Sequence, residues 1–109
     1  GVPMITITPA AAKQIKESAK QSRMEGMALR IAADRQSDGS IHYGMGFDDL
    51  NRDDDTRYTS EGIELVIAPT SRALLDGTIV DFVEIEPGKF EFIFMNPNDA
   101  NYTPPEDAS

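Results

Sequence analysis

The sequence predicts one α+β domain made mostly of β-strands. The length of 109 residues suits a single domain. One long segment has helical periodicity, and six or seven short runs are β-prone with turn residues between them. The apolar share of 39% and the charged share of 27% are ordinary for a chain with a packed core. One helix, a helical turn and several strands together indicate the α+β class.

The first predicted elements are a strand and the main helix. Residues 4–7 form a short β-prone run. Thr8 and Pro9 then supply a hydroxyl N-cap and a proline at the first helical position, so we expect a helix from there to about Ser22. Its narrow apolar stripe consists of Ala12, Ile15 and Ala19, which recur at helical spacing.

Alternating strands and turn residues follow the helix. Gly26 ends the helical pattern, and an Asp-Gly pair at residues 38–39 predicts a turn. From residue 41 to 47, apolar side chains alternate with polar or small ones, as in a half-buried strand. The predicted elements are a strand at 27–33, a loop at 34–40, a strand at 41–47, an acidic loop at 48–55 and a short strand at 57–59.

The C-terminal half predicts a strand, a helical turn and a hairpin. Residues 63–68 read as a strand that Pro69 ends, and 70–75 as a helical turn capped by Thr70 or Ser71. Residues 78–86 and 89–95 form the clearest hairpin of the chain, joined through Pro87 and Gly88. From Asn96 onward there is no apolar period. We therefore expect a flexible tail, with the domain at 4–98 and the tail at 99–109.

Charge and composition exclude several classes of function. The chain has no cysteine, which excludes disulfides, thiolate metal ligands and a thiol nucleophile. The net charge is −9, divided into +3 over residues 1–35 and −12 over residues 36–109, so we expect no binding to nucleic acid. No apolar run is long enough to span a membrane, and a cytoplasmic protein is expected. Residues 1–3 precede a Met4 that resembles a natural start, so we interpret them as a cloning remnant.

Several segments resemble the A-type iron–sulfur carriers, the HesB/IscA family. The opening MITITPAAAK at residues 4–13 and the ALRI at 28–31 are similar to that family. The most specific match is LDGTIVDF at 75–82 followed by FIFMNPN at 92–98, in the same order and spacing. The resemblance covers residues 4–98. It implies a compact β-sandwich or partial barrel with one N-terminal helix and a short helical turn.

The resemblance also implies where the family's cluster ligands would lie. One cysteine of the family falls at Asp38, and the two of its C-terminal Cys-Gly-Cys fall near Thr103 and Pro105. None of these residues offers the soft thiolate that iron–sulfur clusters need. The chain is therefore similar to the cysteine-free branch, the DsrR-type proteins associated with sulfur oxidation, which is regarded as regulatory. We expect no cofactor.

Other candidate residues are weak in the sequence. His42 is the only histidine and should be exposed on its strand, so Asp38 and His42 are weak metal candidates. The acidic loop departs from the EF-hand order, which favours a solvated loop over a cation site. Asp81 should be exposed by the period of its strand, and no grouping of residues supports an enzyme. Lys13, Lys16 and Lys20 form a row that either docks an acidic partner or is a solvated helix flank.

The sequence favours a non-catalytic interaction or regulatory module in sulfur oxidation or iron–sulfur metabolism. Its candidate partner-binding residues are Asp38, Thr103, Lys13, Lys16 and Lys20. The alternative is an iron carrier that uses oxygen and nitrogen ligands: Asp38, His42, Glu106 and Asp107. A nucleic-acid regulator using the basic helix is a third and weaker interpretation. Exposed edge strands and high negative charge together predict a monomer or weak dimer.

Overall fold

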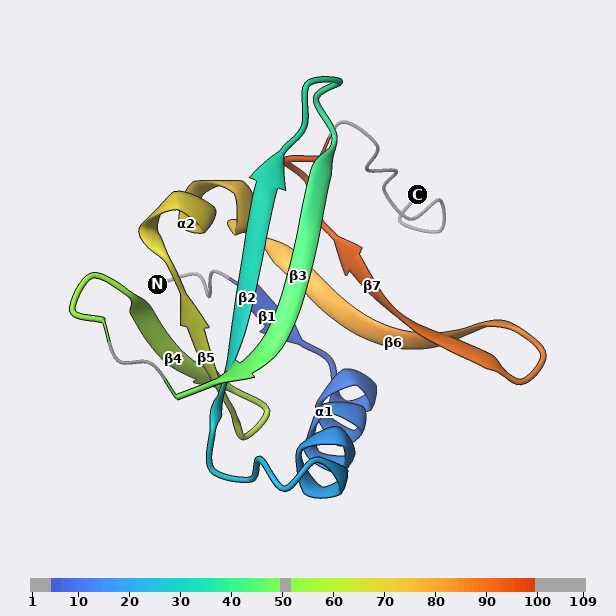
Figure 1. Ribbon diagram of the computed structural model, residues 1–109. Helices are drawn as coiled ribbons and strands as arrows, with labels where there is room; N and C mark the ends of the chain where they lie inside the picture. Colours follow the sequence, from blue (N-terminus) through green and yellow to red (C-terminus); the bar gives the residue numbers. More distant parts are fainter. Residues whose placement is uncertain (1–4, 50–51, 100–109) are drawn as a thin grey trace.

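Two β-sheets and two helices form the domain, as the computed structural model of the protein shows for residues 5–49 and 52–99 (Figure 1). The α+β class is confirmed, with strands predominating. The described elements, in chain order, are β1 (Ile5–Ile7), α1 (Pro9–Gln21), β2 (Ala28–Arg35), β3 (Ile41–Asp48), β4 (Thr56–Ser60), β5 (Ile63–Ile67), α2 (Pro69–Leu75), β6 (Thr78–Glu86) and β7 (Lys89–Met95).

The sheets combine local hairpins with parallel pairs between distant segments. One sheet has the order β1-β6-β7 and the other the order β3-β2-β5-β4. Within them, β1 pairs with β6 and β2 pairs with β5 in parallel, whereas β2–β3, β4–β5 and β6–β7 are antiparallel. The β6–β7 hairpin and the turn between β2 and β3 agree with the sequence prediction, whereas the β4–β5 pair and the two parallel pairs were not predicted.

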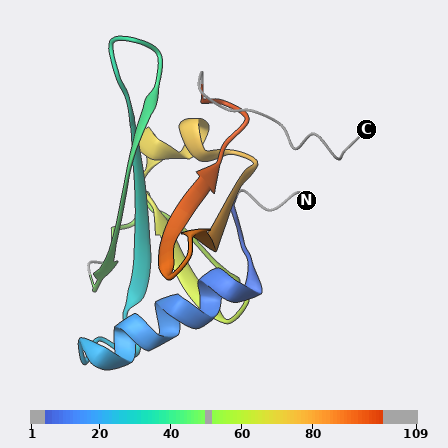
Figure 2. The ribbon, with the colours of Figure 1, turned by 90° about the vertical axis from the view of Figure 1, so that its right-hand side faces the viewer.

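The core lies between the sheets and is closed at one end by α1. Figure 2 shows α1 lying across one end of both sheets. The apolar stripe is confirmed, since Ala12 and Ile15 are buried and Ala19 is half-buried. The largest fully buried side chains are Ile5, Ile7, Ile31, Leu65, Ile67, Leu75, Val66 and Val80. No helix within 5–49 or 52–99 is long and apolar enough to cross a bilayer.

Side chains of β4 tie the two sheets together at β1. The Tyr58 hydroxyl accepts the Ile5 N–H at 2.7 Å and donates to the Ile5 carbonyl at 3.1 Å. The Ser60 hydroxyl accepts the Ile7 N–H at 3.0 Å. These groups satisfy the outer edge of β1, which would otherwise expose unpaired backbone donors and acceptors.

The start of α1 corrects the prediction that Asp81 is exposed. Thr8 is the N-cap as predicted, and its hydroxyl accepts the Ala11 N–H at 3.2 Å. The same hydroxyl donates to Asp81 Oδ1 at 2.6 Å, so Asp81 is half-buried against the helix start. Strand periodicity did not reveal this contact because it joins residues far apart in sequence.

The cap of α2 also differs from the prediction. Ala68, not Thr70 or Ser71, is the N-cap, and no side chain caps this helix. The buried Ser71 hydroxyl instead accepts the Ala33 N–H of β2 at 3.1 Å and donates to the Ala33 carbonyl at 3.4 Å. A local capping preference is overridden because the buried backbone of β2 needs a partner at this point.

Residues 96–98, at the start of the segment that was expected to lack order, are held by side-chain hydrogen bonds. Asn96 is buried, with 1% of its surface exposed, and Asn96 Nδ2 donates to the Leu74 carbonyl at 2.7 Å. Asn98 Nδ2 donates to the Asp76 carbonyl at 2.8 Å. These amides hold residues 96–99 against the end of α2. Residues 100–109 lie outside the described part of the chain, and the domain boundary remains a prediction.

Replacing Ser71 should destabilise the fold because the buried Ala33 N–H would lose its acceptor. We expect Ser71→Ala to lower the free energy of unfolding by about 1–3 kcal/mol, measured by urea denaturation. Ser18→Ala on α1 is the matched control, because this half-exposed site should change stability by less than about 0.5 kcal/mol. Equal unfolding midpoints for the two variants would contradict the assigned role of Ser71.

Candidate functional site

The turn between β2 and β3 carries Asp38 at one end of the molecule. Gln36 N–H donates to the Ser40 carbonyl at 2.8 Å, and Gly39 has a φ of 90°, which favours glycine. Asp38 Oδ1 accepts the Ser40 hydroxyl at 2.6 Å and the Ser40 N–H at 3.0 Å. Asp38 therefore stabilises its own turn, and one carboxylate oxygen is already engaged.

These hydrogen bonds set the charge state of Asp38. The Ser40 hydroxyl, followed by the Ser40 N–H, lowers the pKa of the Asp38 carboxyl below its ordinary value. The side chain is exposed. Asp38 is thus an anionic, hard oxygen donor on the surface at neutral pH.

The C-terminal segment lies beside this turn. Arg35 Nη1 donates to the Gly39 carbonyl at 2.8 Å, and Arg35 Nη2 donates to the Asn98 carbonyl at 3.4 Å. We name residues 36–40 together with residues 96–99 the turn face. Thr103 and Pro105, the other two predicted ligand positions, lie outside the described residues. The structure therefore brings Asp38 next to the segment that leads to them.

Tyr43 supports the turn face from β3. Its ring stacks on that of Phe94, with centroids 4.4 Å apart and planes inclined by 6°. Its hydroxyl donates to Asp99 Oδ2 at 2.9 Å. Burial, opposed by a hydrogen bond with Asn96 and aided by Asp99, raises the pKa of Tyr43 to about 12. The alternation of residues 41–47 predicted only that Tyr43 faces the core, and its contact with Asp99 was not predicted.

His42 is exposed, as predicted, and lies opposite Asp34 in the β2–β3 register. The described ranges 5–49 and 52–99 contain no group of three or more histidine or acidic side chains placed to hold a metal ion. Within the described residues, no further histidine or acidic side chain therefore joins Asp38 and His42 in a metal-binding group.

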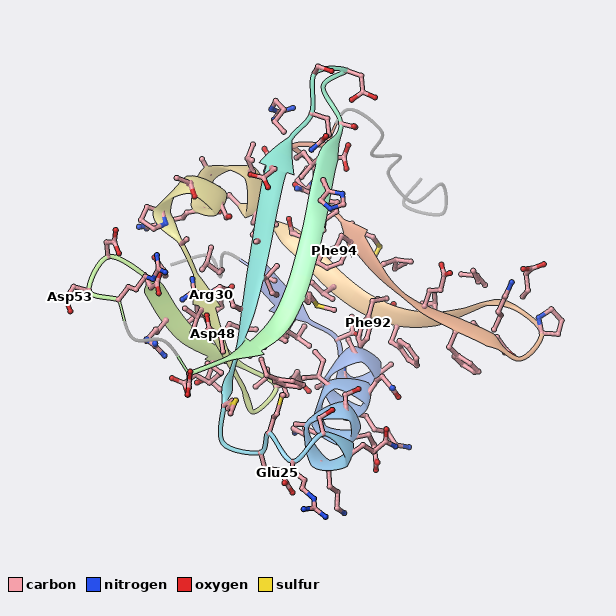
Figure 3. The ribbon with its side chains drawn as sticks, viewed as in Figure 1. Glu25, Arg30, Asp48, Asp53, Phe92 and Phe94 are labelled. Atoms are coloured by element: carbon pink, nitrogen blue, oxygen red, sulfur yellow. The ribbon has the colours of Figure 1, made fainter. Side chains whose placement is uncertain are left out.

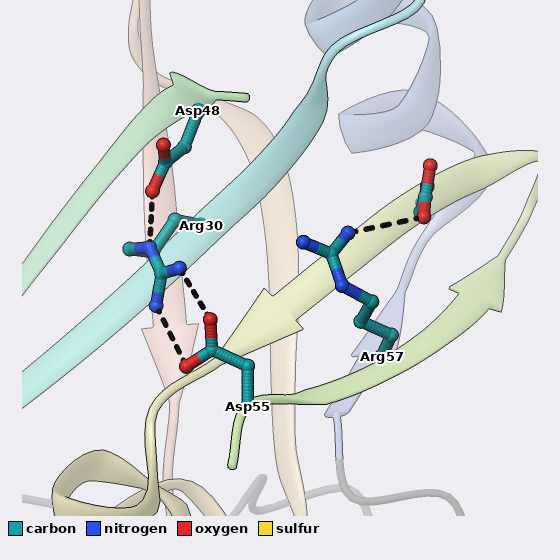
Figure 4. Close-up of polar contacts among 5 residues, drawn as sticks. Arg30, Asp48, Asp55 and Arg57 are labelled. Carbon is teal, nitrogen blue, oxygen red and sulfur yellow. Dashed lines mark hydrogen bonds and ion pairs between the residues drawn. The ribbon is translucent and has the colours of Figure 1, made fainter. Parts of the chain in front are cut away.

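Arg30 changes the interpretation of the acidic loop. Arg30 Nη2 and Nη1 donate to Asp55 Oδ2 and Oδ1 at 2.6 and 3.2 Å, and Arg30 Nε donates to Asp48 (Figure 4). Asp48 ends β3 and Asp55 precedes β4, so one guanidinium joins three strands. Figure 3 shows Asp53 at the loop, turned away from Arg30. The prediction of a uniformly solvated loop is therefore wrong for Asp48 and Asp55.

The ion pairs also set the protonation of this cluster. Hydrogen bonds from Arg30 lower the pKa of Asp55, and the two carboxylates raise the pKa of Arg30. The Asp55 side chain is only 1% exposed and that of Arg30 is 21% exposed. The Arg30 guanidinium binds Asp48 and Asp55. The other acidic side chains of the loop that the structure describes are Asp49, Asp53 and Asp54. They are exposed, which suits the predicted solvated role.

The lysine row is exposed along α1, as its spacing predicted. Lys13, Lys16 and Lys20 all lie on the solvent side of the helix. Lys16 extends over the β4–β5 turn, where its Nζ is 3.1 Å from the place that a Cβ on Gly62 would occupy. This position agrees with the solvated-flank interpretation for Lys16, and docking of an acidic partner stays a prediction for the row.

Comparison with known proteins points to one family. The family described as "Iron-sulphur cluster biosynthesis" matches residues 4–102. The iron-binding protein IscA of Proteus mirabilis is 35% identical over 97 residues, which cover 89% of both chains.

Two solved structures share the fold. A crystal structure of IscA with a [2Fe-2S] cluster has a TM-score of 0.75 and 28% identity, covering 89% of this chain and 88% of that one. Escherichia coli SufA, described as involved in the biosynthesis of iron–sulfur clusters, has a TM-score of 0.71 and 28% identity, covering 94% and 89%.

The ion pair of Asp55 predicts an acid-dependent loss of stability. A carboxyl whose pKa is lowered on folding contributes stability above its unfolded pKa of about 3.9 and loses that contribution as the pH falls through the folded value. We expect Asp55→Asn to be less stable than the natural chain at pH 7, with a difference that shrinks below about pH 4. Urea unfolding across this pH range measures it, with Asp53→Asn as control. A difference independent of pH would contradict the assignment.

The contact between Tyr43 and Asp99 predicts an alkaline titration. We expect Asp99→Asn to lower the pKa of Tyr43, because the variant removes a negative charge beside the phenol. Tyr58, whose pKa burial also raises to about 12, serves as the internal reference and should not move. NMR titration of the labelled tyrosine rings measures both. An unchanged Tyr43 would show that Asp99 does not contact its hydroxyl in solution.

Proposed function

The chain belongs to the iron–sulphur cluster biosynthesis family, and from this membership we propose that it is a non-catalytic module that binds protein partners without carrying a cluster. The partners are proteins of sulfur oxidation or iron–sulfur metabolism in the cytoplasm. The proposal places the chain in the cysteine-free, DsrR-type branch as a regulator. A cluster is the cargo of the carriers it resembles, and this chain has lost the means to hold one.

The donor chemistry of the turn face carries this proposal. The chain has no cysteine, and Asp38 stands at the position that the resemblance assigns to the cysteine of the turn. Clusters of this kind are held by thiolates, whereas Asp38 offers a hard carboxylate with one oxygen already bound to Ser40. Thr103 offers a neutral hydroxyl and Pro105 no side-chain donor. The residues present do not fit a cluster.

The framework around Asp38 supports a surface that binds other proteins. Arg35 joins the turn to the segment after β7, and the buried Asn96 anchors that segment. A rigid, exposed face presented by a scaffold is a usual arrangement for recognition. A regulator that binds the same partners as a carrier would need this framework but would not need the thiolates.

The second candidate function is an iron carrier that uses oxygen and nitrogen ligands. It would draw on Asp38, His42, Glu106 and Asp107, of which the last two lie outside the described residues. The lack of a third donor for Asp38 and His42 within 5–49 and 52–99 weighs against it. Titration with iron(II) under anaerobic conditions, followed by NMR, tests it. No change at either residue would eliminate this candidate.

Anaerobic reconstitution with iron and sulfide tests the main proposal. We expect the natural chain to form no stable, stoichiometric cluster chromophore. The triple variant Asp38→Cys, Thr103→Cys, Pro105→Cys should gain one, because it restores the thiolates where the framework is retained. The triple variant Asp49→Cys, Asp53→Cys, Asp54→Cys controls for three thiols elsewhere on the surface. A stable chromophore on the natural chain would refute the proposal.

A further inference from the structure

The β6–β7 hairpin projects from the body of the domain and exposes apolar side chains. Figure 1 shows its tip extending away from both helices and from the larger sheet. Phe90 is 53% exposed and Ile85 is 46% exposed. Two large apolar side chains at a projecting tip indicate a surface that another molecule covers.

Aromatic rings line one face of this hairpin. The register pairs Phe82 with Phe92 and Glu84 with Phe90, so alternate residues of both strands share a face. The Phe82 ring centroid lies 4.8 Å from that of Phe92 and 5.6 Å from that of Phe90. The rings support one another, and they form a preformed apolar strip along the hairpin.

The strip continues into an apolar hollow between β7, β3 and α1. The hollow has a volume of about 200 Å³, and Phe92 forms its wall on β7. Figure 3 shows Phe92 and Phe94 on the side of β7 that faces β3. The other lining residues are Ile15, Ser18, Leu29, Met45, Gly46 and Phe47.

The backbone beside this strip is an edge. Within the described residues β7 pairs only with β6, and β3 only with β2. β1, at the opposite edge of the smaller sheet, is covered by the hydroxyls of Tyr58 and Ser60. No comparable side-chain bond to the outer edge of β7 occurs among the described residues. An unpaired edge beside apolar pockets is the surface to which an extended peptide adds as a further strand.

Charge identifies the occupant. Residues 81–91 contain Asp81, Glu84, Glu86 and Glu91 against Lys89, a net charge of −3. Pairing of β7 with β7 of a second copy would bring two such segments together. Residues 99–109 of the same chain contain three acidic and no basic residues. The basic row of a second copy lies on α1, which is a helix with its apolar face already buried, so it cannot add to β7 as an extended strand. Each of these occupants is therefore disfavoured.

We propose that the outer edge of β7 binds an extended segment of another protein in which apolar and basic residues alternate. The apolar side chains enter the hollow beside Phe92 and cover Phe90. The basic side chains face Glu91 and compete for Glu86 with Lys89, whose Nζ lies 3.7 Å from the Glu86 carboxylate. This edge is distinct from the turn face. The proposal does not depend on the loss of the cluster ligands, and failure of the reconstitution experiment would leave it unaffected.

Synthetic peptides of about seven residues test the edge, since this is the length of an ordinary strand. The probe KVKFKVK alternates basic and apolar residues, EVEFEVE reverses the charge, and a third peptide carries N-methyl groups on the amides that would pair with β7. We expect amide shifts from KVKFKVK to concentrate at residues 45–47 and 89–95. The acidic and N-methylated peptides should each bind at least about ten-fold more weakly.

Matched charge reversals separate a built site from general attraction to an acidic protein. We expect Glu86→Lys with Glu91→Lys to weaken KVKFKVK at least about ten-fold, and Asp53→Lys with Asp54→Lys by less than about two-fold. Phe90→Ser, at an exposed position, should weaken binding without loss of fold. Equal effects of the two double variants, shifts centred on the acidic loop, or equal binding of the N-methylated peptide would each overturn the proposal. Concentration-dependent self-association through residues 89–95 would also overturn it.

Discussion

The larger sheet depends on one guanidinium. Arg30 is the third residue of β2 and belongs to the short register in which β2 meets β5 in parallel, where it pairs with Val66. Its bonds to Asp48 and Asp55 place the end of β3 and the start of β4 around the same strand. Removing one partner of such a half-buried pair leaves an uncompensated charge, whereas the intact pair serves chiefly to position the strands it joins. The sheet that carries the turn face is therefore assembled around Arg30.

On this base, two hairpins extend in different directions and carry different chemistry. The β2–β3 hairpin ends in a polar turn whose carboxylate, arginine and amides bind one another. The β6–β7 hairpin ends in exposed apolar side chains with acidic neighbours. The aromatic contact between Tyr43 and Phe94 joins the turn end of the β2–β3 hairpin to the base of the β6–β7 hairpin. The domain thus separates a polar recognition surface from an apolar one while both share the same core.

Local patterns in the sequence predicted the elements well, and contacts between distant elements were not predictable. Thr8 and Pro9 indicated the start of α1, and Pro87 with Gly88 indicated the β6–β7 turn, because both signals lie within a few residues. Arg30, Asn96 and Ser71 gave no such signal, since their partners are set by which strands lie side by side. For Asn96, the one indication in the sequence was that it falls within the segment at 92–98 that resembles a known family. The turn at Asp38 was predicted from the Asp-Gly pair, and the resemblance marked Asp38 as a ligand position, but neither predicted its contacts with Arg35 and Asn98 across the turn face.

The parallel pairing of β1 with β6 has a consequence for the order in which the chain folds. Ile5 pairs with Thr78, so the first strand has no sheet partner until most of the chain is available. Closing so long a loop costs more conformational entropy than forming either hairpin, whose strands are adjacent in sequence. We therefore infer that the β2–β3 and β6–β7 hairpins form early and that β1 and α1 dock late. During synthesis the N-terminal strand waits for the C-terminal third, and the apolar residues Ile5 and Ile7 stay unprotected until then.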